Sequence, residues 1–184
     1  MTATTTQRIL LHCCCAPCSG AVVEWMMANG LKPTLFYFNP NIYPSSEYER
    51  RKAESKRYAE ALDLDFVDCD YDHDSWLEQV KGFENEPERG RRCSLCFRMR
   101  LAEAARYAHA NGFDVFATTL ASSRWKDLLQ IDAAGYHAAS LHPGMRFYTR
   151  NWRRGGLTQR RNELIRQYDF YNQTYCGCEF SMRK

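Results

Sequence analysis

Two hydrophobic patterns alternate along the chain. Short continuous apolar runs, such as RILLHC at 8–13, are typical of buried strands, whereas longer segments with apolar residues every three or four positions predict helices. The runs predict strands at 8–13, 33–39, 64–69, 113–120 and 145–149. The helical periods predict helices at 19–29, 45–62, 73–81, 93–110, 127–134 and 160–171, with Gly30, Gly112 and Gly135 at helix ends.

The alternation of strands and helices indicates βαβ units and a mostly parallel sheet. We therefore expect an α/β fold, built as a single three-layer Rossmann-like domain over residues 1–184. Within it, residues 1–7 are expected to form a flexible N-terminus. Residues 150–184 are expected to form a basic C-terminal helix with a Cys-Gly-Cys tail packed on it.

The composition is that of an ordinary globular protein. Of the 184 residues, 45% are hydrophobic and 26% are charged, so disorder is excluded as the dominant state. No apolar run approaches the ~20 residues that a membrane span needs, and residues 1–8 lack the charged region of a secretory signal. We expect a cytoplasmic protein with no membrane partner. We also expect a monomer, because no long exposed apolar stripe is evident.

Charge is distributed unevenly, although the net charge is only +3. Residues 63–88 carry ten acidic side chains and one lysine, so the remainder of the chain is strongly basic. Its basic residues are mostly arginines, which bind phosphate in a bidentate manner better than lysine does. Arginines and aromatic residues are interleaved between 148 and 171. This pattern favours nucleic acid as a partner, and its alternative is an ordinary solvated helix surface.

The nine cysteines point to metal or redox chemistry, because clustered cysteines in a reducing compartment rarely form disulfide scaffolds. They form three groups, which are Cys13, Cys14, Cys15 and Cys18, then Cys93 and Cys96, then Cys176 and Cys178. The first group follows the first predicted strand, at the carboxyl edge where open α/β sheets bind ligands. With the CxxC pair at 93–96 it offers four thiolates, enough for tetrahedral zinc or an iron–sulfur cluster. We favour the cluster, because structural zinc usually holds a short ribbon together.

Other interpretations of these cysteines stay open. Cys15 and Cys18 alone match a thioredoxin-type dithiol at a helix N-terminus, which would make the protein a thiol–disulfide oxidoreductase. A zinc-stabilised RNA-binding module without catalysis is the other alternative. Cys176 and Cys178 would form a strained, redox-active disulfide, or they bind metal. Cys69 stands alone, and we expect it to be a small buried hydrophobe.

Several motifs in the same order resemble the iron–sulfur, cobalamin-independent epoxyqueuosine reductases of tRNA queuosine biosynthesis. They are LLHCCCAPCSG at 10–20, FNPNIYPSSEYERRKAE at 38–54, GRRCSLCFRMRLAEAA at 90–105, ATTL at 117–120 and YCGCEFS at 175–181. The resemblance implies a two-electron reduction of the epoxide of epoxyqueuosine to the alkene of queuosine at the tRNA wobble position. It also implies an external electron donor.

The resemblance assigns a role to most of the cysteines. It implies that Cys14, Cys15, Cys93 and Cys96 hold a [4Fe–4S] cluster, that Cys18 holds an additional iron ion or assists catalysis, and that Cys176 and Cys178 are the redox-active pair. Cys13 is an extra cysteine where a small residue is more typical, so the register of the triplet stays open. The segment 122–126 lacks the family's usual proline but keeps Lys126.

The expected substrate is the tRNA anticodon loop, whose unstacked bases aromatic residues can stack on while arginines hold phosphate. Candidate substrate-binding residues are Asn39, Asn41, Arg91, Lys126, Arg160 and Arg161. His12 adjoins the first cysteine group, but a histidine within a strand is more often a satisfied core residue.

Overall fold

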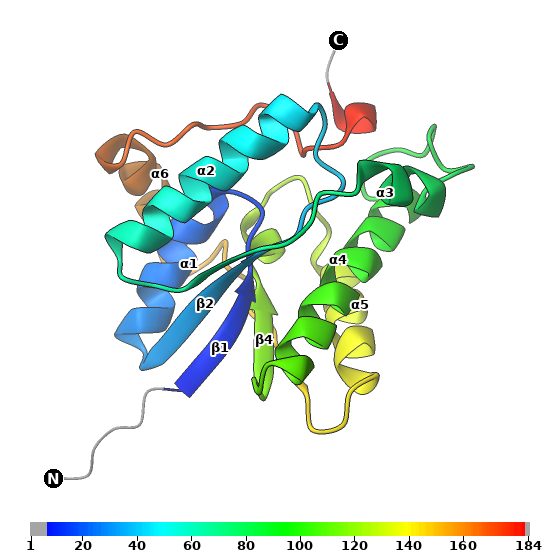
Figure 1. Cartoon of the computed structure of the whole chain (residues 1–184). Coiled ribbons are helices and arrows are strands. Elements are labelled where there is room, and N and C mark those ends of the chain that lie inside the picture. The colour runs from blue at the N-terminus through cyan, green and yellow to red at the C-terminus, as the bar shows by residue number, and fades with distance from the viewer. Residues whose placement is uncertain (1–6, 183–184) are drawn as a thin grey trace, which may run out of the picture.

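The computed structural model describes residues 7–182 of the chain (Figure 1). Its strands are β1 (Gln7–His12), β2 (Leu31–Tyr37), β3 (Phe66–Asp68), β4 (Val115–Thr118) and β5 (Arg146–Tyr148). All pairs are parallel, in the order β3-β2-β1-β4-β5. The predicted parallel α/β sheet is therefore confirmed. Of the predicted flexible N-terminus, residues 1–6 lie outside the described residues, and Gln7 begins β1.

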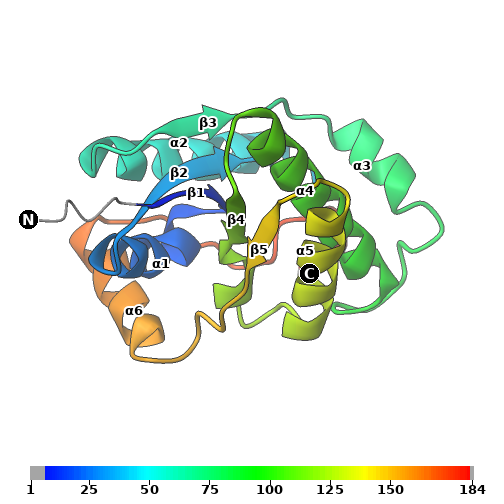
Figure 2. The same cartoon turned by 90° about the horizontal axis from the view of Figure 1, so that it is seen from below.

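Helices cover both faces of this sheet, which confirms the three-layer Rossmann-like architecture. The helices are α1 (Ala16–Ala28), α2 (Ser45–Ala61), α3 (His73–Gln79), α4 (Arg91–Ala110), α5 (Leu128–Ser140) and α6 (Leu157–Gln167). In Figure 2, α1 and α2 cover one face, α4 and α5 cover the other, and α6 packs on α1. Short 3₁₀ turns span Thr119–Ser122 and Glu179–Ser181. Within residues 7–182, no helix is long and apolar enough to cross a membrane.

The central strand β1 is apolar along its length because it is covered on both faces. Ile9, Leu10 and Leu11 are completely buried. The chain proceeds from β1 to β2 and β3 on one side, then crosses to β4 and β5 on the other. This reversal leaves a crevice at the carboxyl ends of β1 and β4, where ligands bind in folds of this kind.

Gly135 does not end a helix as predicted, because α5 continues to Ser140. A Cβ atom at this position would lie 2.2 Å from the ring of Phe147 on β5. The glycine therefore serves close packing of the helix against the sheet rather than helix termination.

The C-terminal helix begins and ends earlier than predicted, at Leu157 and Gln167 instead of at 160 and 171. α6 ends at Gln167, and Asp169 adopts a left-handed conformation with φ of 50°. The next side chain, Phe170, is buried and meets Tyr58 of α2 edge-on. The segment from 168 to 178 then runs without helix along the carboxyl edge of the sheet (Figure 1).

The prediction that Cys69 is a buried hydrophobe is wrong, because its side chain is only partly buried at the end of β3.

Candidate metal and redox site

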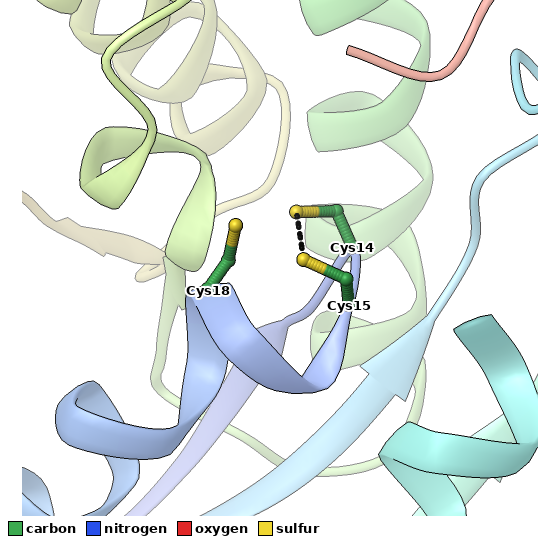
Figure 3. Close-up of side chains that lie close together, drawn as sticks. All are labelled: Cys14, Cys15 and Cys18. Atoms are coloured by element: carbon green, nitrogen blue, oxygen red, sulfur yellow. Dashed lines mark hydrogen bonds between the residues drawn. The ribbon is translucent and has the colours of Figure 1, made fainter. Parts of the chain in front are cut away.

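Three cysteines of the first group gather where β1 connects to α1. The sulfur atoms of Cys14, Cys15 and Cys18 all lie within 4.8 Å of one another, and all three residues are buried (Figure 3). The arrangement depends on an abrupt helix start, since Cys15 is the residue before α1 and Pro17 lies in its first turn. A proline is tolerated there because the first-turn N–H groups have no partner within the helix.

The spacing of these sulfurs fits a metal site. Cys14 Sγ and Cys15 Sγ are 3.8 Å apart. A tetrahedral site with metal–sulfur bonds of about 2.3 Å places its sulfurs about 3.8 Å from one another. Three buried soft donors at this spacing can therefore bind a thiophilic metal.

Within this triad, Cys14 is the thiol best able to ionise. Hydrogen bonds from Cys15 and Cys18 lower the pKa of Cys14, and the nearby charges of Lys126 and Arg100 lower it further. Burial instead raises the pKa of Cys15.

Cys13 points away from the triad. Its Sγ donates to the carbonyl oxygen of Phe36 on β2 at 3.6 Å, and the residue is completely buried. Burial raises the pKa of this thiol well above its usual value. The structure therefore separates Cys13 from the other three cysteines of its group.

The CxxC pair at 93–96 occupies the first turns of α4, on the far side of the crevice. Cys93 Sγ accepts a hydrogen bond from the backbone N–H of Arg89 at 3.3 Å. Cys96 Sγ lies 3.9 Å from Nη1 of Arg100, one turn further along the helix. Neither sulfur belongs to the group that lies within 4.8 Å. Arg100 links the two groups, because its charge interacts with both Cys96 and Cys14, and we call the pair at 93–96 the second wall of the site.

Two buried cations lie between the cysteine groups. Arg100 and Lys126 are 1% and 4% exposed, and no ion pair with a carboxylate is found for either within residues 7–182. Burial works to lower the pKa of Lys126, but thiolate charge at Cys176, Cys14 and Cys18 outweighs it, and the pKa rises. Buried charges need partners, and for Arg100 one of them is Cys96 Sγ at 3.9 Å. The site is therefore built to hold negative charge.

The loop that carries Lys126 is fixed by two arginines. Arg89 donates hydrogen bonds to the carbonyl oxygens of Arg124 and Trp125. Arg153 donates to the carbonyls of Ser123 and Lys126 itself. These contacts define the loop in the absence of the family's usual proline.

The C-terminal cysteines lie beside the second wall of the site. Arg51, 2% exposed, donates to the carbonyl oxygens of Tyr175 and Cys176 and so anchors the tail to α2. Cys178 packs with Cys96 against Trp76 and Val80. Burial raises the pKa of Cys178 to about 11. The fold thus brings all three cysteine groups to one edge of the sheet.

The predicted substrate-binding asparagines have different surroundings. Asn39 is completely buried; its amide donates to the Cys13 carbonyl and accepts from Arg100 Nη2 at 2.5 Å. It therefore positions Arg100, and direct substrate contact would require one of these bonds to break. Asn41 is 2% exposed and its Oδ1 has no hydrogen-bond partner among the described residues. Arg91 is exposed at the start of α4.

The adjacent arginines of α6 differ sharply. Arg160 forms ion pairs with Glu24 on α1 at 2.7 Å and with Glu163 at 2.9 Å. Arg161 donates hydrogen bonds to the amide oxygens of Asn162 and Asn172. Only the second arginine keeps its charge unpaired by a carboxylate among residues 7–182.

His12 is a satisfied core residue, as predicted. Its Nε2 donates to the carbonyl of Phe38, so Nδ1 accepts from the hydroxyl of Thr118 at 2.9 Å. Burial lowers the pKa of His12 to about 3, which keeps the ring neutral.

Some residues of the site carried no clear sequence signal. Gln173 donates to Cys15 Sγ at 2.8 Å, but an isolated glutamine in a loop predicts nothing. Arg100 follows Cys96 by four residues, a helical spacing that could have indicated their contact.

A Rossmann-like fold with clustered cysteine thiols and buried cations at its topological switch point defines an α/β protein whose thiols could hold a metal. Comparison with known proteins identifies the family, because the family model described as Epoxyqueuosine reductase QueH matches residues 9–184. The chain belongs to this family, whose members are oxidoreductases by name.

Curated relatives support the assignment over nearly the whole chain. Epoxyqueuosine reductase QueH of Acinetobacter baylyi is 49% identical over 176 residues, which cover 96% of this chain and 81% of the relative. The protein of the same name from Histophilus somni is also 49% identical and is covered over 72% of its length. The one from Thermotoga maritima is 32% identical, with 95% of this chain and 90% of the relative covered.

Proposed function

We propose that this protein is an epoxyqueuosine reductase that acts on the wobble nucleotide of tRNA. Family membership supports the reaction, and the relatives carry the same name. The observation that carries the proposal is the meeting of three buried thiols with two buried cations that have no carboxylate partner among residues 7–182. A site of this composition fits an anionic metal–thiolate centre better than a neutral ligand.

The cofactor of this proposal is a [4Fe–4S] cluster held by Cys14, Cys15, Cys93 and Cys96, with Cys18 available to an additional iron ion. The donor set is entirely soft sulfur, which suits iron–sulfur chemistry. When bound, such a cluster supplies single electrons, and an iron with an open position is a Lewis acid toward the epoxide oxygen. Arg100 and Lys126 would offset the negative charge of the cluster.

The reduction breaks both carbon–oxygen bonds of the epoxide and forms the alkene. Two electrons and two protons are consumed, and the oxygen leaves as water. The thiols of Cys176 and Cys178 can supply both electrons and both protons by forming a disulfide, which an external dithiol or electron-transfer protein must then reduce. The packing of Cys178 together with Cys96 supports this role, because it places the C-terminal pair beside the second wall of the site.

The tRNA partner accounts for the basic residues near the site. Arg91, Arg161 and Lys126 remain the candidates for substrate contact, whereas the ion pairs of Arg160 favour a structural role. The proposed location is the cytoplasm, where tRNA is modified, and the proposed state is a monomer.

Metal analysis tests the proposal. Protein purified without oxygen should be brown and contain about four or more irons with matching sulfide. It should convert epoxyqueuosine tRNA to queuosine tRNA when a reductant is present. A colourless protein that binds only zinc and lacks turnover would contradict the proposal and support the zinc-stabilised RNA-binding alternative. Disulfide reductase activity without iron would support the thioredoxin-like alternative.

A further inference from the structure

A cavity opens beside Cys18, on the side of the triad away from α4. Its volume is about 460 Å³, within the usual range of small-molecule sites. The start of α1, the 122–126 loop, α6 and the tail around Gln173 form its walls. A ligand in this cavity would therefore lie against the cysteine site while remaining reachable from the surface.

Two tryptophans line this cavity, and only one of them is available to a ligand. Trp152 is 2% exposed, and its indole N–H donates to the carbonyl of Thr118. Trp125 is partly exposed, and within residues 7–182 its indole N–H makes no hydrogen bond. Its loop is fixed by Arg89 and Arg153, so the ring is held on a rigid support. A partly exposed aromatic ring on a fixed loop is a suitable platform for an unstacked base.

Gln173 joins the cavity to the sulfur atoms. The residue is 6% exposed, and its Nε2 donates to Cys15 Sγ at 2.8 Å. Its other polar atom, Oε1, is buried without a partner among the described residues. A buried carbonyl oxygen is costly to leave unpaired, so this acceptor suits a hydroxyl or ammonium donor on a ligand.

The rim of the cavity carries a cation that suits phosphate. Arg161 lines the cavity and has no carboxylate partner among the described side chains, whereas the neighbouring Arg160 is neutralised by Glu24 and Glu163. Arginine binds phosphate oxygens in a bidentate manner. Position and charge therefore favour Arg161 over Arg160 as a contact for an RNA backbone.

We propose that this cavity receives the target base of the RNA as an unstacked nucleotide. In this arrangement Trp125 stacks on the base. Gln173 Oε1 accepts a hydrogen bond from a hydroxyl or ammonium group on the substituent that the modified base carries, and Arg161 binds an adjacent phosphate. The inference rests on the proposed function for the identity of the RNA and adds the residues that select the modified base. Because the target lies in a loop, removing it from its neighbours costs less than extracting a paired base.

Binding measurements on iron-loaded, full-length protein without reductant test the inference separately from turnover. The probes are two anticodon stem-loop RNAs, one with epoxyqueuosine and one with guanosine at the wobble position. Trp125→Ala should weaken binding of the modified stem-loop by about 5- to 150-fold, the range for a lost base–aromatic stack. Trp125→Phe should restore most of the affinity. Tyr136→Ala, an exposed aromatic control on α5, should bind as the wild type does.

The other two residues have distinct signatures. Arg161→Gln should weaken both stem-loops equally and reduce the salt dependence of binding by about one phosphate contact, whereas Arg160→Gln should leave that dependence unchanged. Gln173→Leu should reduce the preference for the modified stem-loop, with the iron content unchanged.

Normal binding by Trp125→Ala together with an unchanged KM would overturn the inference, even if the wild type reduces its substrate. A loss of salt dependence in Arg160→Gln rather than in Arg161→Gln would also overturn the assignment of the rim. If the wild type binds neither stem-loop, the proposed function fails first and the inference fails with it.

Discussion

Replacing Arg100 with methionine removes a buried positive charge beside the cysteine site. The guanidinium lies 3.9 Å from Cys96 Sγ. At that distance, and at the effective dielectric constant of about 20 that describes protein sites, two unit charges attract by about 4 kcal/mol. When Cys96 is a metal-bound thiolate, Arg100→Met forfeits this attraction. Metal affinity should therefore fall by about 10³-fold, since each 1.4 kcal/mol corresponds to a factor of ten.

The effect should be much smaller in metal-free protein, where no metal holds Cys96 as a thiolate. Arg100 is then a buried charge without a charged partner at Cys96, and replacing it by an apolar side chain removes a desolvation penalty on the order of a few kcal/mol. The lost hydrogen bond to Asn39 costs about 1.5–3 kcal/mol, the range for bonds to charged groups. The two contributions have opposite signs, so the stability of the metal-free protein should change much less than metal affinity does.

Chelator competition measures the metal affinity, and urea unfolding of metal-free protein measures the stability. Arg98→Met is the matched control, because Arg98 is an exposed residue of the same helix. If Arg100→Met binds metal as tightly as Arg98→Met, the electrostatic account of the site is wrong. A large loss of stability in the metal-free protein would show that Arg100 is required for folding instead.

Three further predictions concern single side chains. Since the pKa of His12 is about 3 in the folded protein and 6.5 in the unfolded chain, its contribution to stability is complete above pH 6.5 and is lost as pH falls toward 3. Over this range the free energy of unfolding should fall by about 5 kcal/mol. Urea unfolding at several pH values should show that the free energy of unfolding of His12→Gln depends less on pH than that of the wild type. An equal pH dependence in the two proteins would contradict the argument. Cys13→Ala should keep its iron while Cys15→Ala loses it, as read by absorption and iron analysis; the reverse result would shift the ligand register by one residue. Cys176→Ser and Cys178→Ser should keep the cluster spectrum but lose most multiple turnover, and iron loss in either variant would make the pair metal ligands.

The sequence predicted the order and type of the elements well because hydrophobic period reports burial directly. The central strand around Leu10 is apolar because both of its faces are covered. The buried face of α4 could also be predicted, because its apolar residues recur at helical spacing. The errors lie where tertiary contacts decide. Gly135 was interpreted as a helix end, although the ring of Phe147 is what requires it. Nothing local indicates that α6 ends at Gln167, because burial of Phe170 against α1 and α2 redirects the chain.

For the site, cysteine spacing predicted the chemistry but not the arrangement. Spacing alone could not separate Cys13 from its neighbours, which the strand geometry does by directing its thiol toward Phe36. The sequence also could not distinguish Arg160 from Arg161, because Glu24, the ion-pair partner of Arg160, is 136 positions away from it in the chain. Charges and hydrogen bonds formed across such distances depend on the completed fold.

The most direct test of the account is a single-turnover reaction analysed by nucleoside mass spectrometry. Iron-loaded protein with reduced Cys176 and Cys178 is mixed without oxygen with less than one equivalent of tRNA carrying epoxyqueuosine. We expect the epoxyqueuosine nucleoside to disappear and queuosine, which contains one oxygen atom fewer, to appear in equal amount. Iron-loaded protein that binds the tRNA but leaves its epoxyqueuosine unchanged when the reductant is present would contradict the central claim.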